Sequence, residues 1–137
     1  MKNMNVRLST LWIFAVFNYL YADIVTLMDP DILGQIMTGS IGSMEISEGF
    51  LLGGAILVET AIAMVVLSRV LAYRANRWAN ILIGALNTAA VFLSLFMGGT
   101  RPALYYLFFA TIEIACTLLI VWYAWKWKPV AAPTVCS

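Results

Sequence analysis

The chain has 137 residues, of which 63% are hydrophobic and only 11% are charged. Soluble domains carry roughly 25% charged residues, so this composition excludes an ordinary water-soluble fold. The formal net charge of +1, without a basic patch interleaved with aromatic residues, gives no support to a nucleic-acid partner. The chain contains no histidine, so the usual zinc, haem and di-iron ligand sets are missing, and we expect neither a metal nor another cofactor.

Four apolar stretches have the length that a bilayer-spanning helix needs, about 20 residues. They run over residues 8–28, 49–71, 79–97 and 103–125. The first does not read as a signal peptide, because it is too long, contains Asn18 and Asp23, and lacks a small-residue cleavage pattern. We expect an all-α integral membrane protein: one antiparallel bundle of four transmembrane helices over residues 1–128, followed by a disordered cytoplasmic tail over residues 129–137.

The first external connection, between the first and second spans, contains a helix signal of its own. Asp29 followed by Pro30 is typical of an N-cap and a first helical position. Apolar residues at positions 32, 33, 36 and 37 repeat at helical spacing, and Thr38-Gly39-Ser40 ends the run. This predicts a short amphipathic helix on the outer surface, which is either a lid over a site or an ordinary interfacial linker. Between the third and fourth spans, residues 98–102 predict a tight turn.

Charge placement predicts the orientation of the spans. Lysine and arginine gather at the N-terminus, in the second connection and after the fourth span, at positions 2, 7, 69, 74, 77, 126 and 128. Only Arg101 lies at the opposite end, together with four acidic residues at positions 29, 31, 45 and 48. By the positive-inside rule, both termini and the second connection are cytoplasmic.

Polar residues near the middle of the spans are the candidate functional groups. A carboxylate at that depth costs about 2.5–3.5 kcal/mol or more, so it requires a partner, a proton or a wet cavity. The candidate ligand- or proton-binding residues are Glu59, Glu113, Asn87, Asn18, Asp23 and Tyr106. No catalytic residue is assigned from the sequence.

We expect the two glutamates to lie together. Small residues beside Glu59 would let a neighbouring helix approach, so Glu59 is predicted to face the bundle. No lysine or arginine occurs at mid-depth, so Glu59 and Glu113 are predicted to share a proton, level with Asn18 and Asn87. Asp23 is predicted to lie nearer the outer surface. The alternative is that these side chains only hold the helices together through hydrogen bonds.

Five segments resemble a family of small bacterial four-span membrane proteins classed as a domain of unknown function. The resemblance covers nearly the whole chain and is carried by residues 8–14, 37–39, 59 with 62–69, 76–80 and 120–126. It implies a four-helix membrane fold in a bacterial cytoplasmic (inner) membrane. It brings no assigned activity, so no catalytic residue is carried over.

A second, local resemblance concerns residues 53–59. Gly53-Gly-Ala-Ile-Leu-Val-Glu59 is similar to the glutamate-bearing first helix of small multidrug transporters. Here the segment lies in the second span, and the remaining motifs do not follow, so we treat the match as chance or convergence.

Three functions are compatible with the sequence. The first is a protein that binds or transports a proton, a cation or a cationic amphiphile in a central pocket lined by carboxylates and amides. The second is a membrane enzyme acting on a lipid or isoprenoid substrate, with paired glutamates as general acid and base. The third is an accessory subunit of a membrane complex. The expected partners are the lipid bilayer, a lipophilic or cationic small ligand, and further copies of the chain in a homo-oligomer.

Overall fold

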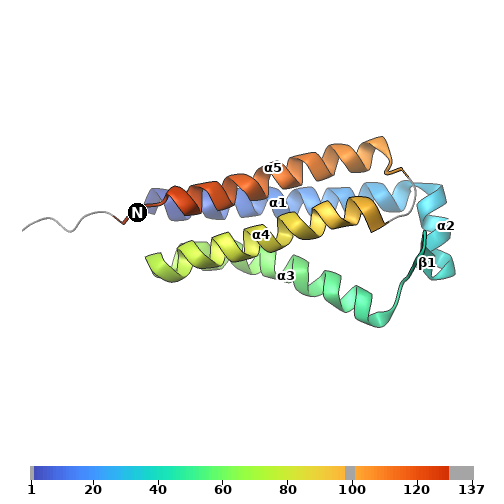
Figure 1. Ribbon diagram of the computed structural model, residues 1–137, viewed down its shortest axis with the longest axis horizontal. Coiled ribbons are helices and arrows are strands. Elements are labelled where there is room, and N and C mark those ends of the chain that lie inside the picture. The colour runs from blue at the N-terminus through green and yellow to red at the C-terminus, as the bar shows by residue number, and fades with distance from the viewer. Residues whose placement is uncertain (1, 98–100, 130–137) are drawn as a thin grey trace, which may run out of the picture.

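The computed structural model describes residues 2–97 and 101–129 and is built mainly of helices (Figure 1). Four helices are long and apolar enough to cross a membrane: α1 (Lys2–Met28), α3 (Glu48–Val70), α4 (Tyr73–Met97) and α5 (Leu104–Lys126). α1 and α4 run in one direction and α3 and α5 in the other (Figure 1). The predicted antiparallel bundle of four apolar helices is confirmed.

Two helices begin well before the predicted spans. α1 starts at Lys2 and α4 at Tyr73, so the second connection shrinks to Leu71 and Ala72. The length of the apolar stretch did not predict this extension of α4, because the first turns of the helix contain polar side chains. Two of these, Asn76 and Asn80, are fully buried. The predicted turn at 98–102 lies mostly outside the described residues, as does the predicted tail beyond residue 129.

The end of the bundle where α1 finishes, which we call the outer end after the predicted orientation, carries a small cap. It consists of α2 (Pro30–Thr38) and an antiparallel hairpin of β1 (Ser40–Ile41) and β2 (Met44–Glu45). The Asp29 side chain accepts a hydrogen bond from the Asp31 backbone N–H at 3.0 Å, and Gly39 ends the helix with a φ of 83°, which favours glycine. The Gly42 N–H donates to Gln35 Oε1 at 2.8 Å and so ties the hairpin to α2. The predicted short helix is confirmed.

At the opposite, inner end, polar side chains form a fully buried cluster, which we call the inner polar cluster: Trp12, Ser68, Asn76 and Asn80. Trp12 Nε1 donates to Asn80 Oδ1 at 2.8 Å, and Ser68 Oγ donates to the same oxygen at 3.3 Å. The Asn80 amide in turn donates to Asn76 Oδ1 at 2.6 Å. These bonds join α1, α3 and α4, because each helix contributes at least one member of the cluster.

α4 and α5 pack closely along their length. A Cβ at Gly84 would lie 2.8 Å from Val121 Cγ2, so a glycine is needed for this approach. One turn further, Thr88 Oγ1 donates to Thr117 Oγ1 at 2.7 Å. Small residues at such a contact are typical of helix pairs in membranes.

α3 packs against the bundle with its inner half only. Its buried residues, Ala61, Met64 and Ser68, repeat at helical spacing and face α1 and α4. Every residue from Glu48 to Ile56 is exposed, and the outer half of α3 diverges from the other three helices (Figure 1). The outer part of the bundle is therefore formed by α1, α4 and α5.

Candidate functional site

The mid-depth polar residues of α1, α4 and α5 meet in one layer. Asn18 Nδ2 donates to Glu113 Oε1 and to the Phe109 carbonyl oxygen, both at 3.2 Å. The neighbouring Tyr19 hydroxyl donates to Asn87 Oδ1 at 3.3 Å, and the Asn87 amide donates to the Ile83 carbonyl. We call Asn18, Tyr19, Asn87 and Glu113 the mid-depth polar layer.

Two of the four residues in this layer are buried, and the other two, Asn18 and Tyr19, are half-buried. Glu113 is 6% exposed and Asn87 is 1% exposed. The Asn18 amide and the Tyr19 hydroxyl donate to acceptors on neighbouring helices, whereas the Asn87 amide donates within α4, and no lysine or arginine occurs in the middle of any span. The arrangement joins α1 to both α5 and α4. Of the predicted candidates, Asn18, Asn87 and Glu113 are thus brought together.

Glu59 is not part of the layer, and the prediction that it faces the bundle is wrong. Glu59 is exposed on α3, whereas Glu113 is buried in α5. The buried face of α3 contains Ala61, two residues further on, and at 100° per residue this lies about 200° from Glu59. The two glutamates therefore do not form the coupled pair that the sequence suggested.

The two remaining candidates lie further out. Asp23 is exposed, one turn of α1 beyond Tyr19. The Tyr106 hydroxyl and Ser94 Oγ share a hydrogen bond of 2.6 Å that joins α5 to α4 near their outer ends. Tyr106 also lines a pocket that the other five candidates do not reach.

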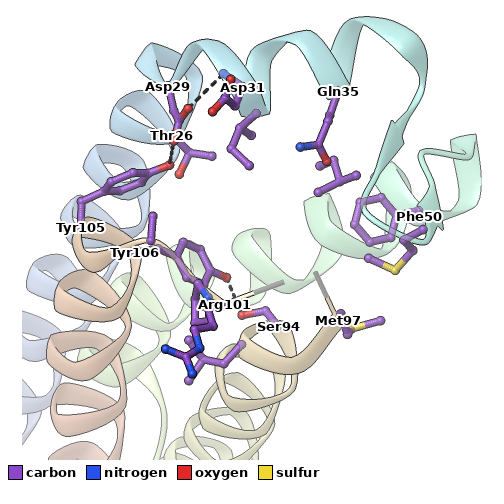
Figure 2. Close-up of a pocket in the computed structure, with 16 residues that line it drawn as sticks. Thr26, Asp29, Asp31, Gln35, Phe50, Ser94, Met97, Arg101, Tyr105 and Tyr106 are labelled. Carbon is purple, nitrogen blue, oxygen red and sulfur yellow. Dashed lines mark hydrogen bonds between the residues drawn. The ribbon is translucent and has the colours of Figure 1, made fainter. Parts of the chain in front are cut away.

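This outer pocket has a volume of about 460 Å³ and lies beneath the cap. Its walls come from the end of α1, from α2 and the hairpin, from Phe50 of α3, from residues 94–97 of α4 and from residues 101–106. Figure 2 shows Asp29 and Asp31 on one side of the pocket and Arg101 on the side opposite the two aspartates. The side chain of Gln35 extends from α2 toward the pocket, and Phe50 of α3 lies below it. Most of the remaining lining is apolar, including Ile32, Ile41, Met44 and Leu95.

Asp29 is fixed at the rim of the pocket. The Tyr105 hydroxyl donates to Asp29 Oδ2 at 2.8 Å. This bond, together with the backbone N–H groups of Asp31 and Ile32, outweighs desolvation and holds the pKa of Asp29 below its ordinary value. Asp29 is therefore ionised at neutral pH, and the side of the pocket that it shares with Asp31 is negatively charged.

Comparison with known proteins identifies the family of the chain. The profile of a family described as a family of unknown function (DUF6326) matches residues 1–133. The chain belongs to this family. No curated protein and no solved structure matches it. The resemblance to a family of unknown function is confirmed, and the family assigns no role to any residue.

Of the residues that line the pocket of this DUF6326 member, only Tyr106 is predicted as a site residue from the sequence. Phe50, Ser94 and Tyr105 are far apart in the sequence and meet only because the cap folds over the ends of α1, α4 and α5. One signal was available, since Asp29, Asp31 and Arg101 are the charged residues nearest the outer ends of three spans. Their placement indicated a polar outer face but could not show a cavity.

Acidification is expected to loosen the cap through Asp29. Because its pKa is lowered in the folded state, the stabilisation it provides is present above its ordinary pKa of about 4 and is lost as the pH falls through the lowered value. Hydrogen–deuterium exchange of α2, corrected for intrinsic rates, should show protection that is constant from pH 7 to pH 5 and that decreases below about pH 4. Asp29→Asn should remove this pH dependence, whereas an unchanged pH profile in that variant would contradict the assignment.

Proposed function

We propose that this membrane protein binds a lipophilic organic cation in the outer pocket. The observation that carries the proposal is a cavity of about 460 Å³ at the end of the bundle, largely apolar, with Asp29 and Asp31 on one side. A ligand with a hydrocarbon body and a positive charge matches both features. The proposed binding pocket lies at the outer end of the bundle, whereas the sequence predicts one in the middle.

The sign of the ligand charge follows from the lining. The pocket lining contains two carboxylates and one guanidinium, and Arg101 lies on the far side from the aspartates (Figure 2). Tyr105, Tyr106 and Phe50 add aromatic faces that attract cations. The carboxylates would repel an anion of the same shape at the place where they attract a cation.

The pocket has an outward orientation in this proposal. The basic residues at the inner end of the bundle support cytoplasmic termini, and the family resemblance supports a bacterial inner membrane. The pocket then opens at the outer membrane surface, beside the diverging half of α3. The enzyme alternative requires paired glutamates, and the exposure of Glu59 removes that pairing.

Two ions of matched shape test the proposal. The purified chain in lipid nanodiscs is dialysed against tetraphenylphosphonium, a cation, or tetraphenylborate, an anion, with protein-free nanodiscs subtracted. Saturable binding of the cation should be about tenfold tighter than that of the anion. Equal binding of the two ions, or no saturable binding of the cation, would refute a cation site.

Variants locate the site. Asp31→Asn removes one charge from the pocket lining, and it should weaken tetraphenylphosphonium binding about two- to fivefold, since exposed charge pairs contribute little. Glu48→Gln is the matched control, because Glu48 is an exposed acidic residue at the same end of the bundle but does not line the pocket. Equal effects of the two substitutions would place the binding elsewhere.

A further inference from the structure

α3 presents a face that no described residue of its own chain covers. Residues Glu48–Ile56 are all exposed, and a Cβ placed on Gly53 or Gly54 would meet no atom within 4 Å. Leu52, Ile56, Val66 and Val70 continue this exposed face along the helix at spacings of four, ten and four residues, which are sums of three- and four-residue steps, with exposures of 60%, 56%, 61% and 74%. The face lies opposite the buried residues Ala61, Met64 and Ser68.

Glu59 lies in the middle of this face. It is the central residue of the 23-residue α3, and its side chain is exposed. Hydrocarbon tails offer no hydrogen-bond partner. Inserting a charged carboxyl group into the membrane at this depth costs about 2.5–3.5 kcal/mol or more of free energy. No lysine or arginine of this chain lies in the middle of a span, so its own helices do not supply a cation.

We propose that a second copy of this chain covers the face, with α3 packed against α3 of the partner and the two Glu59 carboxyl groups hydrogen-bonded to each other. A twofold axis along the membrane normal keeps both copies in the same orientation and places equivalent residues opposite each other. A carboxylic acid group both donates and accepts, so the Glu59 pair is self-complementary at a mid-span position where the described residues of each copy supply no hydrogen-bond partner.

The residues around Glu59 fit such a contact. Ala55 lies one turn from Glu59 on the same face of the exposed outer half, where a small side chain allows two helix backbones to approach closely. Because α3 diverges from α4 in its own chain, this half is accessible to another helix (Figure 1). A lipid could fill the same space but would leave the carboxyl group without a hydrogen bond.

Cysteine cross-linking in liposomes tests the geometry. In the full chain with Cys116→Ser and Cys136→Ser, Ile56→Cys should give a disulfide-linked dimer on oxidation, at low protein-to-lipid ratio. Phe92→Cys is the control, since Phe92 is 54% exposed on the outer half of α4. Equal cross-linking at both positions, or none at position 56, would overturn the proposal.

Substitution of Glu59 tests the pairing. Glu59→Leu should weaken dimerisation about tenfold, measured by energy transfer between labelled copies diluted in lipid, whereas Glu59→Gln, which can still donate and accept, should weaken it much less. Both variants should keep the unfolding temperature of the monomer, because the side chain is exposed. Dimerisation of Glu59→Leu equal to that of the unmodified chain would refute the pairing, and tetraphenylphosphonium binding to the outer pocket provides a separate check that the variants are folded.

Discussion

Asn80→Ala is expected to lower the free energy of unfolding by about 2–4 kcal/mol, the largest effect of any single change considered for this fold. Asn80 is fully buried, and its Oδ1 accepts hydrogen bonds from Trp12 Nε1 and Ser68 Oγ. Its amide donates to Asn76. Alanine leaves two buried donors without their acceptor and also opens a cavity between α1, α3 and α4.

Unfolding of the purified chain by added sodium dodecyl sulfate, followed by circular dichroism, measures this effect. Leu82→Ala is the control on the same helix, because Leu82 is 62% exposed, and it should change the free energy of unfolding by less than about 0.5 kcal/mol. If both variants unfold at the same detergent fraction, the inner polar cluster does not hold the helices together.

The helices and the cap could be predicted because their signals are local. Four long apolar stretches require four spanning helices, and Asp29, Pro30 and Gly39 mark the two ends of α2 through backbone capping. These features depend on neighbours within a few residues. The structure therefore reproduces them, although α1 and α4 each begin six residues before the predicted span.

The orientation of α3 could not be predicted in the same way. In a soluble helix the apolar face is the buried one, but in a membrane the lipid is as apolar as the core, so hydropathy does not show which face packs. The small residues near Glu59 suggested a packing face, whereas the packing face is that of Ala61, Met64 and Ser68. Ser68 was the better signal, because a hydroxyl near Asn76 and Asn80 can join a buried network.

Asn18 is hydrogen-bonded to Glu113 and Asn87 to the neighbouring Tyr19, at the common level expected from the sequence, but they do not line the pocket. Depth along each span follows from counting residues, so polar groups at one level can be matched from the sequence. Whether they enclose a cavity depends on side-chain directions and on the helices around them. The structure joins the layer through direct hydrogen bonds and has its pocket beneath the cap.

Asn18→Leu is expected to lower the free energy of unfolding by about 1–2 kcal/mol, because it removes two interhelical hydrogen bonds and leaves Glu113 Oε1 without its donor. Glu113→Gln should cost less, since the glutamine oxygen can accept the same bond from Asn18. The double variant Asn18→Leu with Glu113→Leu should be less destabilised than the sum of its single variants, because replacing both partners leaves no polar group unsatisfied.

The same variants separate a structural layer from a ligand site. If the mid-depth polar layer only joins α1 to α5, Asn18→Leu lowers stability while the affinity for tetraphenylphosphonium stays within about twofold of the unmodified chain. If the layer binds the cation, Glu113→Gln abolishes binding and leaves stability nearly unchanged, because glutamine keeps the hydrogen bond but not the charge. Binding and unfolding measured on one preparation decide between them, and only the first result agrees with a ligand held beneath the cap.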